Sequence, residues 1–225
     1  MSKNREEQNI ARFKHIKFTE QPISETGDNL PLGVNLPIER VQRQLQTDPV
    51  KAIPVLEEWI KKYPRTGTFY NYLMYAYHTD GRTKEAEALT LLAYEKAPHY
   101  LFSKVGYAQY CMKQGHVDKI PEIFENKLDL AELYPKRKVF HKSEVQGFYT
   151  LMCQYYAMTK NSEMGWACYD YLKFLTPDDP SLPQLQRALI VGTFPRWKAY
   201  LMIAGIILLV IALIVLIIWG LGKLV

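Results

Sequence analysis

An uncharged apolar run near the C-terminus constrains this chain more than any other feature. Residues 200–219 read YLMIAGIILLVIALIVLIIW, and fourteen of these twenty residues are Leu, Ile or Val. A helix of this length spans about 30 Å, the thickness of a bilayer's hydrocarbon core, and satisfies its backbone hydrogen bonds internally. The alternative is a buried core helix. The run predicts a transmembrane anchor over residues 199–220, which includes Tyr200, Gly205, Ala212 and Trp219.

The basic residues around this run predict its orientation. Arg187, Arg196 and Lys198 precede the apolar run, whereas only Lys223 follows it. Because cytoplasmic flanks carry the excess of Lys and Arg, we expect a single-pass membrane protein whose N-terminal domain faces the cytoplasm. The first residues, MSKNREEQNIARFKHIKF, lack the apolar stretch of a signal peptide, which agrees with this orientation. The sequence does not indicate which membrane is involved.

The residues before the anchor have the composition of one ordinary globular domain. The whole chain is 48% hydrophobic and 23% charged, with a formal net charge of +5. Its three cysteines, Cys111, Cys153 and Cys168, show no Cys-x-x-Cys spacing, so they predict neither a disulfide framework nor a zinc site. The densest basic cluster, residues 136–142, is expected in a solvated loop, with contact to anionic lipid or an acidic partner as the alternative.

A repeat of 34 residues organises the middle of the chain. Gly81 and Gly115 are separated by 34 positions, as are Pro64 and Pro98. Between residues 67 and 100, Tyr70, Leu73 and Tyr77 form one stripe at helical spacing, and Ala86 and Ala93 leave room for close helix packing. A glycine after a first helix and a proline after a second delimit a pair of helices.

This pattern resembles the tetratricopeptide repeat, in which antiparallel helix pairs stack on one another. The resemblance implies an all-α fold: a tetratricopeptide-like solenoid of helical hairpins over residues 33–194, plus the C-terminal transmembrane helix. The expected units are 33–66, 67–100, 101–134 and 148–181, followed by a capping helix over 182–194. Residues 1–32 are polar and lack a sustained period, so they predict a mobile N-terminal arm.

The resemblance also implies a protein-binding groove on the concave surface, lined by the first helix of each unit. The residues expected to line this groove are Asn71, Tyr75, His78, Val105, Gln109, Met112, Met152 and Tyr156. Two alternatives remain: this tyrosine-rich stripe packs inside the fold, or the N-terminal arm occupies the groove. The expected partners are a protein or peptide in the groove and the lipid bilayer around the C-terminal helix.

No pattern of residues predicts catalysis. The five histidines are scattered, and the chain has neither an HExxH motif nor a glycine-rich phosphate loop. We therefore expect no enzyme activity, no cofactor, no metal, no nucleic acid and no small-molecule substrate. The favoured function is that of a membrane-anchored adaptor or assembly factor. The alternatives are an organelle receptor that resembles mitochondrial fission receptors in plan, and a structural subunit of a membrane complex.

Overall fold

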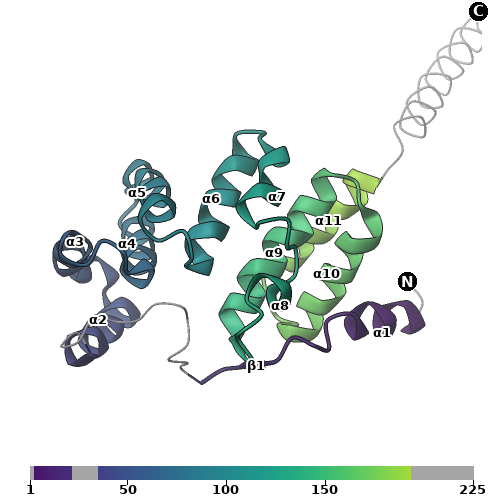
Figure 1. Cartoon of the computed structure of the whole chain (residues 1–225), viewed down its shortest axis with the longest axis horizontal. Helices are drawn as coiled ribbons and strands as arrows, with labels where there is room; N and C mark the ends of the chain where they lie inside the picture. Colours follow the sequence, from purple (N-terminus) through teal and green to yellow (C-terminus); the bar gives the residue numbers. More distant parts are fainter. Residues whose placement is uncertain (1–2, 22–34, 194–225) are drawn as a thin grey trace, which may run out of the picture.

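A computed structural model describes residues 3–21 and 35–193 of the chain (Figure 1). This part of the chain is mostly helical, with eleven α-helices, two 3₁₀ turns (η1 and η2) and a parallel pair of two-residue strands. The prediction of an all-α fold is confirmed at this level.

The helices before the middle of the chain are α1 (Lys3–Ala11), α2 (Asn35–Thr47), α3 (Ile53–Lys62), α4 (Gly67–Thr79) and α5 (Thr83–Lys96). Those after it are α6 (Leu101–Lys113), α7 (Ile120–Ile123), α8 (Leu130–Leu133), α9 (Lys142–Met158), α10 (Ser162–Leu175) and α11 (Leu182–Thr193). The strands are β1 (Phe18–Thr19) and β2 (Phe140–His141), and the 3₁₀ turns are η1 (Pro49–Ala52) and η2 (Val117–Lys119).

From α3 to α6, each helix packs against the next in the chain; α6 then packs against α9, which packs against both α10 and α11 (Figure 1). The pairs α2–α3 and α4–α5 share one apolar core, to which Leu56, Phe69 and Leu73 contribute fully buried side chains. The helices from α6 onward share a second core, which includes Phe124, Phe148 and Leu151. Of the two tyrosines predicted to line the binding groove, Tyr156 is buried in the second core, whereas Tyr75 is 53% exposed.

The two cores meet between α5 and α6. The rings of Tyr94 on α5 and Tyr107 on α6 stack with centroids 4.3 Å apart. At Gly67, the first residue of α4, a side chain would collide with the ring of Tyr100, so only glycine allows this close approach. The row of helices is therefore continuous across the change of core.

The predicted glycine turns have the expected backbone. Gly81 follows α4 with a φ of 74°, and Gly115 follows α6 with a φ of 82°. At the equivalent point after α9, Lys160 takes a φ of 60°. Side chains other than glycine pay a steric penalty in this left-handed conformation, so the third turn is more strained than the first two.

The interval 101–134 departs most from a regular helix pair. In place of one continuous second helix, the structure has η2, α7 and, after Glu125 and Asn126 at φ values of 56° and 59°, the short α8. Lys104 explains part of this path: its buried ammonium donates hydrogen bonds to the carbonyl of Ile123 at 2.9 Å and to Glu125 at 3.1 Å. A buried ammonium group needs hydrogen-bond acceptors. The carbonyls of a regular helix already accept from amides of the same helix, so an irregular segment provides the free acceptor.

The helix of the last unit begins earlier than predicted. α9 starts at Lys142, six residues before the predicted start at 148, because the preceding residues cap it. The His141 side chain accepts from the backbone amide of Ser143, and the Glu144 carboxylate accepts from the amide of His141 at 2.9 Å. This reciprocal arrangement satisfies two amides that a helix N-terminus otherwise leaves free.

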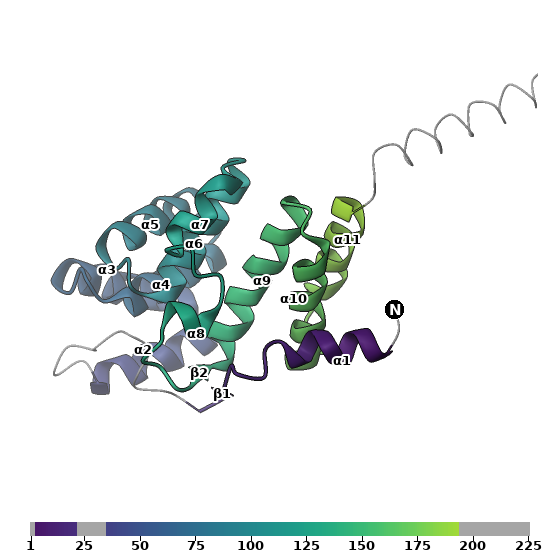
Figure 2. The same ribbon diagram turned by 45° about the vertical axis from the view of Figure 1, so that its right-hand side comes forward.

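The basic cluster is more structural than predicted. Arg137 donates two hydrogen bonds, at 3.0 and 2.6 Å, to the buried carboxylate of Glu144, and its guanidinium lies 4.4 Å from the centre of the Phe140 ring. Lys142 pairs with Glu20 at 2.7 Å. In Figure 2 the strands β1 and β2 lie at the lower edge of the molecule, below α8 and α9.

The prediction of a mobile arm over residues 1–32 is wrong for residues 3–21. This segment forms α1, which packs on α10, and β1, which pairs in parallel with β2, Phe18 opposite Phe140 (Figure 2). Composition misled here because α1 is polar, and it docks mainly through polar contacts. Residues 22–32 lie outside the described part of the chain.

The predicted membrane anchor, residues 199–220 with Tyr200, Gly205, Ala212 and Trp219, also lies outside the described residues. Among the helices within residues 3–21 and 35–193, none has the length and apolar character needed to cross a membrane.

Candidate functional site: a groove between three helices

A groove of about 770 Å³ lies between α6, α9 and α11. We call it the α6–α9–α11 groove. Its apolar floor and walls are formed by Met112, Ala157, Met158, Leu185, Ala188 and Val191. Its polar rim is formed by Gln109, Lys113, Gln154, Lys160 and Gln184. Most of its accessible surface is apolar, as is typical of ligand and protein-binding sites.

α11 forms one wall because two glycines allow it to approach closely. At Gly192 on α11, a side chain would collide with the carbonyl oxygen of Ala157 on α9. At Gly165, the start of α10, a side chain would collide with the side chain of Leu189. Leu185 and Leu189 are buried by this contact, with 2% and 0% of their surface exposed. Since α11 and α9 meet at their C-terminal ends, the two helices run in the same direction.

Large apolar side chains that line the groove are exposed. Met158 is 49% exposed and Val191 74%, and Ile190, which does not line the groove, is 50% exposed. These residues lie near the ends of α9 and α11, at the end of the molecule from which the chain continues toward residue 194. Exposed apolar side chains that gather beside a groove are typical of a protein interaction surface.

The structure does not bring the eight predicted groove residues together. Gln109 and Met112 line the α6–α9–α11 groove. Tyr75, 53% exposed, His78, exposed, and Asn71, half-buried, all lie on α4, which contributes no residue to this groove.

Three of the predicted groove residues lie in the core. Val105, Met152 and Tyr156 are 5%, 0% and 8% exposed, because α6 and α9 are covered by neighbouring helices on these faces. These side chains belong to the second apolar core.

Several groove residues were missed in the sequence. Leu185, Ala188 and Val191 lie on α11, for which the sequence predicts only a capping helix, and Met158 is the last residue of α9. One signal was present: Ala188, Leu189, Ile190 and Val191 are four consecutive apolar residues, which on a helix point in every direction. A capping helix covered on one side must leave some of them exposed.

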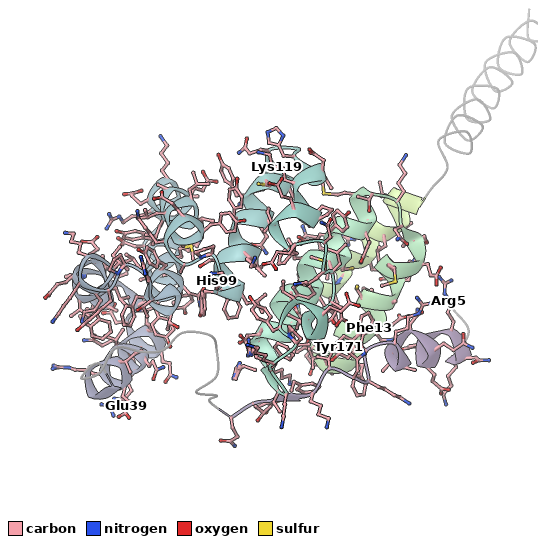
Figure 3. The ribbon with its side chains drawn as sticks, viewed as in Figure 1. Arg5, Phe13, Glu39, His99, Lys119 and Tyr171 are labelled. Carbon is pink, nitrogen blue, oxygen red and sulfur yellow. The ribbon has the colours of Figure 1, made fainter. Side chains whose placement is uncertain are left out.

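A second constellation joins the N-terminal segment to the last helix pair. Asn9 donates a buried hydrogen bond of 2.7 Å to Asp170 on α10, across 161 residues of sequence. Phe13 follows α1 and inserts between Tyr149 and Tyr171, with both centroid distances 4.8 Å; Figure 3 shows Phe13 beside Tyr171. Burial raises the pKa of Asp170, which the hydrogen bond from Asn9 partly offsets.

Charged contacts surround this buried centre. Glu6 pairs with Lys173 at 3.1 Å, and Arg12 pairs with Glu163. His15 lies 3.1 Å from Asp129, which also accepts hydrogen bonds from the Tyr149 hydroxyl and the Ala131 amide. α1 packs on α10 and contributes no residue to the α6–α9–α11 groove.

The cysteine thiols occupy buried positions in the core. The three cysteines are buried and free. Burial raises the pKa of the Cys153 thiol to about 12 and that of Cys168 well above its ordinary value, so both thiols stay protonated at neutral pH. Within the described residues, no group of three or more His, Cys, Asp or Glu side chains is arranged to hold a metal ion.

A scan against protein-family models, a search of curated proteins and a search of solved structures found no match for this chain.

Proposed function

We propose that this protein is a noncatalytic adaptor of the tetratricopeptide type, anchored to a membrane by residues 199–220, with its helical domain in the cytoplasm. Its ligand is a helical segment of another protein, which binds in the α6–α9–α11 groove. The observation that carries this proposal is the groove itself, which has an apolar floor, a rim of amides and ammonium groups, and exposed apolar side chains at its open side.

The dimensions of the groove favour a helix as ligand. The α11 wall extends from Gln184 to Gly192, and nine helical residues span about 13 Å. A ligand helix of two to three turns matches this wall and presents apolar residues at i, i+3, i+4 and i+7 to the floor. Fully burying an aliphatic side chain is worth about 1.5–3 kcal/mol, so Met158 and Val191 supply a useful part of the binding energy.

The proposed anchor explains how such a small site becomes effective. Six residues lie between Thr193 and Tyr200, and the seven Cα–Cα steps across them span at most about 25 Å when the chain is fully extended. An anchor at residue 200 therefore keeps the open end of α11 near the bilayer surface. A partner held at the same membrane meets the groove at a raised effective concentration, which compensates for weak intrinsic affinity.

Site-specific photocrosslinking tests the groove. A benzoylphenylalanine probe replaces Gln184, which lines the groove, in the full chain; the matched control replaces Gln186, which is exposed on another side of α11. We expect adducts at position 184 that are absent at 186 and that map to a helical segment of the captured protein. Equal adducts from both positions, or none at 184, would refute the groove as the binding site.

The anchor is tested separately. The full chain should sediment with membranes after a high-salt wash, and a chain lacking residues 199–225 should not. A truncated chain that remains on membranes equally well would show that another part of the protein holds it there.

A further inference from the structure

The polar side chains that line the α6–α9–α11 groove differ between its two ends. Each wall carries one glutamine: Gln109 on α6, Gln154 on α9 and Gln184 on α11. The two lysines lie toward the other end, since Lys113 is the last residue of α6 and Lys160 follows the last turn of α9. One end of the groove thus offers neutral amides, and the other offers two ammonium groups.

The lysine end carries a net positive charge that the groove does not balance. Both lysines are exposed, and no Asp or Glu is found among the described residues that line the groove. A cation near a helix C-terminus is stabilised by the helix dipole, which explains why a lysine is tolerated at each position. That stabilisation does not account for the apolar floor between them.

A helical ligand with carboxylates at one end complements this arrangement. Its apolar face covers Met112, Met158 and Val191, and its carboxylates reach Lys113 and Lys160 at the rim. If its C-terminal end lies over the lysines, the negative end of its own dipole adds to the attraction. The glutamines at the opposite end form hydrogen bonds with either donors or acceptors, so they impose little further selection.

We infer that the α6–α9–α11 groove selects an acidic amphipathic helix whose carboxylates gather in its C-terminal turn, over Lys113 and Lys160. This inference rests on the proposed function and names the class of its ligand. Electrostatic complementarity of this kind gives specificity and a faster association rate, in addition to affinity from the apolar floor.

Designed peptides test the inference with the full chain in phosphatidylcholine nanodiscs, with empty nanodiscs as the background. The first probe is an amphipathic helix of about three turns, with leucines at i, i+3, i+4 and i+7 and two glutamates in its last turn. The second has the same residues with the glutamates moved to the first turn. The third carries lysines in place of the glutamates. Fluorescence anisotropy reports each affinity at low and at high salt.

We expect the first peptide to bind about tenfold more tightly than the third, on the basis of two exposed ion pairs of about 0.2–1 kcal/mol each exchanged for repulsion. The second peptide should have an intermediate affinity, and high salt should reduce the difference. The double variant K113E/K160E should reverse the preference. The double variant K113Q/K160Q keeps the shape of the rim and should bind the first and third peptides equally; thermal melts of both variants verify that they fold.

Each outcome separates the two proposals. If all three peptides bind equally well at the groove, the charge inference is wrong and the groove remains a binding site. If no peptide binds and the probe at Gln184 gives no adduct, the proposed function fails as well. Adducts between that probe and residues 200–219 of the same chain or of a second copy would also overturn the inference, because this segment carries no carboxylate side chain.

Discussion

Replacing Phe13 by alanine should release the N-terminal segment from the rest of the protein. The Phe13 side chain is 4% exposed and contacts the rings of Tyr149 and Tyr171. It is the large apolar side chain at the centre of a contact surrounded by hydrogen bonds and ion pairs. We therefore expect the docking of residues 3–21 to depend on it more than on any one of the charged pairs.

The size of the effect follows from burial and from the position of the segment. Truncating a buried Phe to Ala costs about 3–5 kcal/mol, which includes the two ring contacts at about 0.5–1.5 kcal/mol each. A terminal segment can open without unfolding the helices that it covers, so this cost falls on local opening and cannot exceed the docking energy of the segment. Amide exchange in α1 should accelerate by roughly 100- to 4,000-fold, up to the rate of a fully undocked segment.

Hydrogen exchange measured by mass spectrometry on the full chain provides the assay. Amides of α4 and α5, which belong to the other core, should exchange at unchanged rates. The matched control is R12Q, which removes the neighbouring exposed ion pair with Glu163 and should cost less than about 1 kcal/mol. If α1 exchange is unchanged in F13A, or if R12Q has an equal effect, Phe13 does not hold the segment in place.

Three further predictions concern single residues of the last helices. K160G should stabilise the protein by up to about 1 kcal/mol, measured by urea denaturation, because glycine removes the strain of a positive φ; a loss of stability would contradict this. G192A should destabilise it by about 1–3 kcal/mol and abolish peptide binding, because the added methyl displaces α11 from Ala157; unchanged binding in a folded variant would contradict the described wall. Burial raises the pKa of Asp170 in the folded state above its ordinary value of 3.8. Because the folded protein therefore binds this proton more tightly than the unfolded chain does, the free energy of unfolding falls as the pH rises above 3.8. D170N should flatten this part of the stability profile, and an unchanged slope would show that Asp170 does not determine it.

The local features of the fold were predictable from the sequence, and the reasons are physical. Gly81 and Gly115 end helices with a left-handed backbone, which glycine adopts at little cost. Tyr70 and Leu73 lie on one helix face, and their burial follows from their spacing alone. The break in the interval 101–134 was less predictable, since it depends on which acceptors the buried Lys104 finds in three dimensions.

The candidate site was predicted only in part. Of the predicted groove residues, Gln109 and Met112 line the α6–α9–α11 groove, and both lie on α6. The other two walls depend on how α9 and α11 pack, and α11 approaches α9 only because Gly192 has no side chain. Such a contact has no signature within a single helix. The same limit applies to α1, whose composition gives no indication of a surface 161 residues away.

The contact between Asn9 and Asp170 also fixes an order of events during synthesis. At about 5–20 residues per second, the ribosome needs about 8–30 s to make the 161 residues that separate these two side chains. For that time the first segment has no surface to dock on, while α2 to α5 already have a core of their own. α1 is polar, so during this interval it exposes few apolar side chains that could form non-native contacts or aggregate. Residues 3–21 thus leave the ribosome well before the surface of α10 on which they dock.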